Sequence, residues 1–93
     1  EGITGKVAAT GKAIIIPEII DEPSFLDRIG TRHQQRGVAF ICVPILNKEQ
    51  VIGTMSIDRV KGDNTDLEHD QNLLETVANI LADAVAAILR EYE

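Results

Sequence analysis

An apolar repeat at three- and four-residue spacing fills the last third of the chain. It predicts a helix over residues 66–91, begun by a capping box in which Thr65 caps the helix and Glu68 reaches back. A second apolar edge makes this face wider than one sheet would cover, so we expect a second partner for the helix. The main stripe holds Leu67, Leu74, Val77, Ala78, Leu81, Ala84, Val85, Ile88 and Leu89, and the second edge holds Leu73, Ile80 and Ala87.

The first third of the chain predicts a short helix, a short strand and an irregular segment. Residues 3–10 have the apolar spacing of a helix. Gly11 follows at the position where a residue in the left-handed conformation commonly ends a helix. The apolar residues 13–16 predict a strand that stops at Pro17. The irregular segment 17–37, interrupted by prolines and glycines, spaces Arg28, Arg32 and Arg36 four residues apart.

The middle of the chain predicts a β-hairpin. Residues 38–46 are almost all apolar, which is typical of a strand covered on both faces. Pro44 lacks an amide hydrogen, so one side of that strand must be unpaired there, or a bulge must intervene. Residues 51–60 alternate between an apolar and a mixed face, and the polar turn 47–50 joins the two strands.

This order of elements predicts an α+β fold with an antiparallel sheet and helices on its faces. The 93 residues allow a single domain, 1–93. Aromatic residues make up only 3% of the chain, so the core must be aliphatic.

Charge and composition narrow the functional classes. The net charge of −6 disfavours direct nucleic-acid contact and binding to an anionic membrane. No uninterrupted apolar run approaches the roughly 20 residues of a membrane span, and no targeting signal is visible, so we expect a cytoplasmic protein. The chain begins at Glu1 without a methionine, and its natural N-terminus could lie upstream.

Few side chains offer catalytic or metal chemistry. Cys42 lies within an apolar strand, where a thiol is a small core residue far more often than a nucleophile. His33 and His69 fit no metal-binding spacing, and both are expected at the surface. We therefore expect neither an enzyme nor a metal site. The three arginines of segment 17–37 could clamp carboxylates bidentately, or they could be solvated surface charges.

Several spaced motifs resemble GAF domains. Residues 2–7 (Gly-Ile-Thr-Gly-Lys-Val), 10–12, 14–17, 44–45 and 51–58 carry the general resemblance. Residues 23–28 (Pro-Ser-Phe-Leu-Asp-Arg) and 40–45 resemble, more specifically, the sensory GAF domains of transcriptional activators of nitrogen-fixation genes. The resemblance covers the whole chain.

The resemblance implies a small-molecule-sensing regulatory domain of a sigma-54-dependent activator. It implies a ligand between the mixed sheet face and segment 17–37, where an anionic metabolite such as 2-oxoglutarate would meet arginine. The expected lining residues are Phe25, Leu26, Arg28, Arg32, Phe40 and Cys42. No cofactor is implied.

Three other functions remain open. The first is a GAF module that dimerises without a ligand. The second is a cyclic-nucleotide or tetrapyrrole sensor of a signalling enzyme, although no cysteine lies in the loops where a bilin could attach. The third resembles a methionine-sulfoxide reductase of GAF fold, whose chemistry uses several cysteines where this chain has one.

The resemblance also implies a partial domain. GAF domains open with a long helix and two strands before the helix at which this chain begins. The remaining sheet is therefore expected to expose an edge that can pair with another chain. With the wide apolar face of the last helix, this edge predicts a homodimer, formed through residues 73–89, through the sheet edge, or both.

Overall fold

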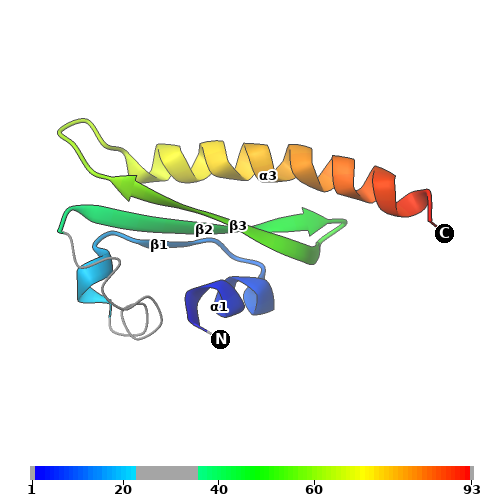
Figure 1. Ribbon diagram of the computed structural model, residues 1–93, viewed down its shortest axis with the longest axis horizontal. Coiled ribbons are helices and arrows are strands. Elements are labelled where there is room, and N and C mark those ends of the chain that lie inside the picture. The colour runs from blue at the N-terminus through cyan, green and yellow to red at the C-terminus, as the bar shows by residue number, and fades with distance from the viewer. Residues whose placement is uncertain (1, 23–35, 93) are drawn as a thin grey trace.

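The computed structural model describes residues 2–22 and 36–92. They form an antiparallel sheet of three strands in the order β1-β2-β3, with α1 on one face and α3 on the other (Figure 1). The elements are α1 (Gly2–Thr10), β1 (Ile14–Ile16), the 3-10 turn η1 (Ile19–Asp21), β2 (Val38–Asn47), β3 (Gln50–Val60) and α3 (Leu67–Arg90). The predicted α+β class is confirmed, and each predicted helix or strand outside segment 17–37 is found to within one residue of its expected bounds.

The central position of β2 in the sheet explains why its sequence is almost entirely apolar. Phe40 and Cys42 face α1 and η1, whereas Ile41 and Val43 face α3. None of these four side chains is more than 8% exposed. Because β1 and β3 flank β2 in the sheet and helical elements cover both of its faces, a polar side chain here would lose its contact with water.

Pro44 lies in β2 where pairing is one-sided. The partners of β1 run only from Phe40 to Cys42, so at Pro44 the strand pairs with β3 alone. The register then shifts between Ile45 and Leu46. Proline was predicted to require either an unpaired side or a bulge; the unpaired side is present at Pro44, and a bulge follows it.

Helix α1 ends as the sequence predicts. Gly11 has a φ of +72°, and its amide donates a hydrogen bond of 2.8 Å to the carbonyl of Val7. A residue with a Cβ would be strained in this left-handed conformation. Val7 itself is fully buried against the sheet.

The predicted capping box is wrong. Asp66, not Thr65, caps α3, and its carboxylate accepts a hydrogen bond of 3.1 Å from the amide of His69. The Thr65 hydroxyl instead accepts one of 2.6 Å from the amide of Gly62, within the loop before the helix. An aspartate at the cap also places a negative charge at the positive end of the helix dipole, which explains the preference.

One ion pair ties β3 to the first turn of α3. The Arg59 Nε donates to Asp70 Oδ2 at 2.9 Å, with the aspartate side chain 16% exposed. Neighbouring residues on a strand point to opposite faces, so Arg59 reaches the α3 side and Asp58 does not.

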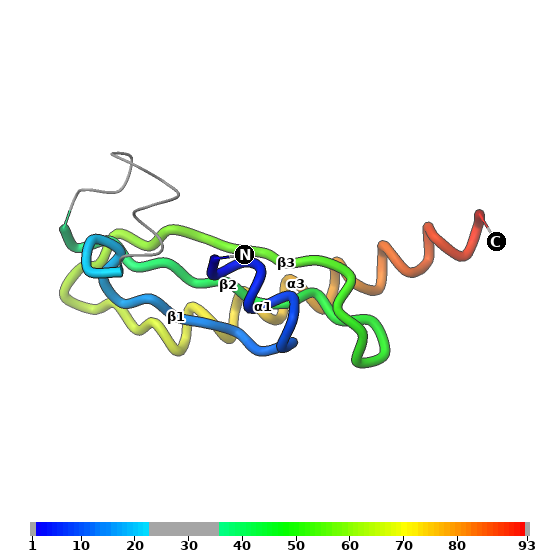
Figure 2. The backbone as a smooth tube through the Cα atoms, turned by 90° about the horizontal axis from the view of Figure 1, so that it is seen from below, coloured from blue at the N-terminus to red at the C-terminus, as the bar shows by residue number. Residues whose placement is uncertain are grey.

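Much of α3 is not covered by the sheet. Fewer residues of the predicted main stripe are therefore buried than the apolar repeat indicated. Only Leu74, Ala78 and Ala82 are buried, and the C-terminal end of the helix extends past the hairpin end of the sheet (Figures 1 and 2). The radius of gyration, 14.6 Å, exceeds the roughly 12 Å expected of a compact chain of this length. Several of the predicted core residues are half exposed, among them Val77, Leu81, Ile88 and Leu89.

Helix α3 also has the length and composition of a membrane span, with a mean hydropathy of 1.5 over its most apolar window. Glu75 and Asp83 interrupt that window, which is why no uninterrupted apolar run appeared in the sequence. Its buried residues pack on Ile41, Val43 and Ile45 of β2. Removing α3 into a bilayer would expose that sheet face, so we treat α3 as a helix of the folded domain.

Candidate functional site

The candidate site is the sheet face that carries Phe40 and Cys42. Both side chains lie in a cluster with Val7 of α1 and Ile19 of η1, completed by Ile16 and Val38. The other four predicted ligand residues, Phe25, Leu26, Arg28 and Arg32, lie outside the described residues. Whether these six residues meet at one site therefore stays a prediction.

The predicted mixed face of β3 lies beside this apolar cluster. In the register of the hairpin, Phe40 pairs with Asp58 and Cys42 pairs with Ser56. Thr54, two residues before Ser56, is on the same face and is half-buried. The face toward α1 is thus apolar on β1 and β2 and polar along β3, which is the combination of surfaces that a small polar ligand needs.

Cys42 is unsuited to nucleophilic chemistry. Burial raises the pKa of its thiol above the ordinary value of 9.0, and side-chain hydrogen bonds with Thr4 and Thr54 oppose that shift without reversing it. The thiolate is the reactive form, so a fully buried thiol with a raised pKa is inert near neutral pH. This geometry supports the interpretation of Cys42 as a core residue.

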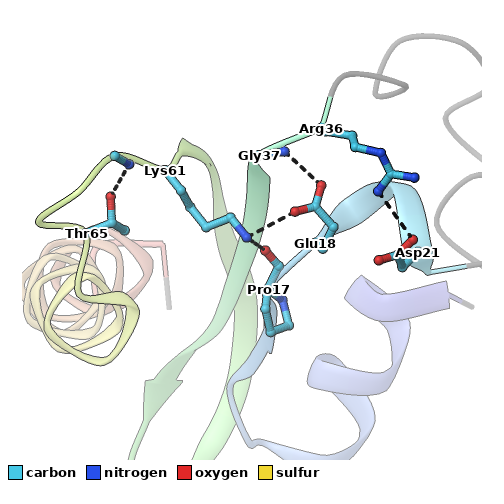
Figure 3. Close-up of polar contacts among 8 residues, drawn as sticks. Pro17, Glu18, Asp21, Arg36, Gly37, Lys61 and Thr65 are labelled. Carbon is cyan, nitrogen blue, oxygen red and sulfur yellow. Dashed lines mark hydrogen bonds and ion pairs between the residues drawn. The ribbon is translucent and has the colours of Figure 1, made fainter.

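A polar cluster holds together the two ends of segment 22–36. The Glu18 carboxylate accepts a hydrogen bond of 2.9 Å from the amide of Gly37 and lies 3.1 Å from the Lys61 ammonium group (Figure 3). The same ammonium group donates to the carbonyl of Pro17, and the Lys61 amide donates to the Gly37 carbonyl at 2.8 Å. Three chain segments, the end of β1, the start of β2 and the end of β3, therefore meet at one carboxylate.

The electrostatics of this cluster favour the charged form of Glu18. The Gly37 amide, and after it the Lys61 ammonium group, lower the pKa of Glu18 below its ordinary value of 4.5. A second pair, Arg36 with Asp21, is weaker, because the charged atoms are 4.0 Å apart and both side chains are mostly exposed. Arg36, predicted as part of the arginine face, thus faces a carboxylate of η1.

The sequence did not predict that Glu18, Gly37 and Lys61 form one polar cluster. They are separated by 19 and 24 positions, and no periodicity connects them. The available signal was the position of each residue at the end of a predicted strand, because strand ends meet at a sheet edge. Among residues 2–22 and 36–92, no group of three histidine, cysteine or acidic residues could hold a metal ion.

The sequence model of a known protein family matches nearly all of this chain. The model of the GAF domain matches residues 1–85. The chain belongs to the GAF domain family. This confirms the resemblance drawn from the spaced motifs of α1, β2 and β3.

Curated relatives of this GAF domain are nitrogen-fixation proteins. It is 43% identical to the Nitrogen fixation protein VnfA of Azotobacter vinelandii over 98% of this chain and 18% of that protein. It is 40% identical to the Nitrogen fixation protein AnfA of the same organism, over 98% and 17%. The Nif-specific regulatory protein of Azospirillum lipoferum is 34% identical, over 91% and 14%. The chain thus spans less than a fifth of the length of these relatives.

A solved structure shows the same fold. The crystal structure of the A. aeolicus nlh2 GAF domain in an inactive state superposes with a TM-score of 0.76 at 29% identity. The match covers 88% of this chain and 51% of that chain. The sheet and helices described above are therefore an arrangement that a GAF domain adopts in a crystal.

Proposed function

We propose that this GAF domain is the small-molecule-sensing module of a bacterial activator of nitrogen-fixation genes that works with sigma-54 RNA polymerase. One observation carries the proposal: identities of 43% and 40% with two nitrogen-fixation proteins extend over 98% of the chain. The similarity therefore includes every helix and strand of the described residues and is not confined to one motif. A cytoplasmic location and a regulatory, non-enzymatic role follow from the proposal.

The sheet face toward α1 supports a sensing role. Apolar Phe40 lies beside the polar row of β3, where Thr54 and Ser56 provide hydroxyl groups. An anionic ligand on this face would need positively charged side chains to bind it. Arg28 and Arg32 are the proposed source, and a dicarboxylate such as 2-oxoglutarate is the proposed ligand class.

Isothermal titration calorimetry with 2-oxoglutarate tests the proposed ligand. We expect the double variant Arg28→Ala/Arg32→Ala to bind at least about tenfold more weakly than the unaltered chain, because each bidentate arginine–carboxylate contact contributes roughly 1.5–3 kcal/mol. Arg90→Ala, at the far end of α3, is the matched control for loss of positive charge and should bind normally. Equal affinity of all three proteins would reject the arginine clamp.

A GAF module that dimerises without a ligand is the second candidate. It is favoured by the burial of the proposed binding face, because Cys42 is fully buried and Phe40 is only 8% exposed. Native mass spectrometry of the purified chain distinguishes the two functions. A small molecule retained in stoichiometric amount supports sensing, whereas a ligand-free protein that also gives no heat with 2-oxoglutarate supports the second candidate.

A further inference from the structure

We propose that Gly37 and Lys61 form a binding site for a small aliphatic carboxylate, and that the Glu18 side chain occupies this site as an internal ligand (Figure 3). A free carboxylate that displaced Glu18 would separate the end of β1 from the adjoining ends of β2 and β3. The inference does not rest on the proposed function, because none of the residues expected to line the sensory site takes part in it.

The donors of the site match the two oxygens of one carboxylate. The Gly37 amide donates to Oε2 of Glu18 at 2.9 Å, and the Lys61 ammonium group donates to Oε1 at 3.1 Å. Each carboxylate oxygen therefore has its own donor, and the bond from the ammonium group joins two opposite charges. A phosphate group has more oxygens but gains no further donor from these two residues, so the arrangement favours a carboxylate.

Both donors are held by contacts that do not involve the Glu18 side chain. The Lys61 amide donates to the Gly37 carbonyl at 2.8 Å, which joins the two residues at the open end of the hairpin. The Lys61 ammonium group also donates to the carbonyl of Pro17. Gly37 has a φ of +83°, a conformation that costs glycine little. Removal of the carboxylate should therefore leave both donors in position to bind another one.

The Glu18 carboxylate is free to be replaced as far as its own segment is concerned. Glu18 precedes the 3-10 turn η1, but its side chain makes no capping hydrogen bond to that turn. Its side chain is 23% exposed, and that of Lys61 is 28% exposed. A small molecule in solution can therefore reach the two donors without opening of the apolar core.

The charges near the site favour an anion. The Gly37 amide, then the Lys61 ammonium group and more weakly Arg36, lower the pKa of Glu18. The same groups would hold a free carboxylate in its ionised form. In the unaltered chain, however, the tethered Glu18 competes at a high effective concentration. A simple monocarboxylate should therefore bind measurably only when Glu18 is removed.

Chemical rescue of Glu18→Ala with acetate tests the site. The variant deletes one methylene group and the carboxylate, and acetate supplies an equivalent group of atoms. At neutral pH, about 0.3 M sodium acetate should raise the thermal midpoint of this variant by at least about 2 °C relative to sodium chloride of equal ionic strength. The unaltered chain and Asp21→Ala are the matched controls. Neither should show this difference, because Glu18 still fills the site in both.

A second lysine variant locates the bound acetate. Lys61→Met, added to Glu18→Ala, should abolish the rescue because it removes one of the two donors. Lys48→Met in the same background removes an exposed lysine of the hairpin turn and should leave the rescue intact. If Glu18→Ala alone is unfolded, acetate should restore its folded circular-dichroism spectrum, with the same dependence on Lys61.

Nuclear magnetic resonance of the Gly37 amide reports on the other donor. In Glu18→Ala its resonance should shift progressively with acetate, and it should stay in place with acetamide, which has the shape of acetate without the charge. Rescue by phosphate equal to that by acetate would reject a carboxylate site. The proposal would also be overturned by absence of rescue, by equal rescue of Asp21→Ala, or by rescue that survives Lys61→Met.

Discussion

The Glu18 carboxylate accepts a hydrogen bond of 2.9 Å from the backbone amide of Gly37, 19 residues further along the chain. Gly37 has a φ of +83°, a conformation that costs glycine little and directs its amide toward the carboxylate. The contact holds the end of β1 against the start of β2, and Lys61 adds the end of β3 to the same group. The segment that carries the predicted ligand residues thus begins and ends at one fixed point.

We expect Glu18→Ala to lower the urea midpoint of unfolding measurably. The variant removes the acceptor of the Gly37 amide and the partner of the Lys61 ammonium group, and both groups are then left without the carboxylate. Asp21→Ala is the matched control, since its ion pair with Arg36 is 4.0 Å long and largely exposed. Urea titrations followed by circular dichroism provide the comparison. Equal midpoints for both variants would show that Glu18 is no more important than a surface charge.

The lowered pKa of Glu18 predicts a dependence of stability on pH. In the unfolded chain this carboxyl group titrates near 4.5, whereas in the folded chain its pKa is lower, so the unfolded state binds more protons in acid. The contribution of Glu18 is therefore complete above pH 4.5 and is lost as the pH falls through the folded pKa. Urea unfolding of the unaltered chain and of Glu18→Gln should give a difference that shrinks between pH 6 and pH 3. A difference that stays constant or grows in acid would contradict this assignment.

The sequence predicted the elements of the fold better than their polar connections. The apolar run of β2 and the repeat of α3 are strong signals, because burial on two faces or on one stripe constrains many residues at once. The capping residue was misassigned, since Thr65 and Asp66 are both good caps and adjacent, and only backbone conformation separates them. The contacts of Glu18 join distant segments through single side chains, which leave no periodic trace in the sequence.

Replacement of Asp66 tests the corrected start of α3. Asp66→Ala should reduce the free energy of unfolding by about 0.5–2 kcal/mol, the usual contribution of an N-cap side chain. Glu68→Ala should cost clearly less, because the Thr65 amide that a capping box would pair with Glu68 donates instead to the Gly62 carbonyl at 3.3 Å. Thermal unfolding monitored at 222 nm measures both variants. If Glu68→Ala is the more damaging change, the capping box predicted from the sequence is supported and the assignment of Asp66 as the cap is wrong.

The turn between β2 and β3 can be stabilised. Lys48 and Glu49 both have positive φ values, 52° and 69°, in a two-residue connection between the paired residues Asn47 and Gln50. Such a turn favours Asn-Gly, since residues with longer side chains cost roughly 1–2 kcal/mol each in this conformation. We expect Lys48→Asn/Glu49→Gly to raise the free energy of unfolding by about 1 kcal/mol, after the entropy lost by glycine is subtracted. Gly37→Ala should have the opposite sign, and a loss of stability in the hairpin double variant would contradict the turn geometry.

Alkylation rates test the interpretation of Cys42 as a core thiol. Its side chain is fully buried and burial raises its pKa, so iodoacetamide should modify it only when the domain opens. Ser56→Cys is a matched comparison, because Ser56 pairs with Cys42 across the hairpin but is exposed. At pH 8 we expect the thiol at position 56 to react at least roughly 100-fold faster than Cys42, a ratio set by the small population of open molecules. Mass spectrometry resolves the two sites after digestion, and denaturing urea should remove the difference. Comparable rates without urea would mean that the face toward α1 opens readily, and Cys42 would then be accessible to a ligand.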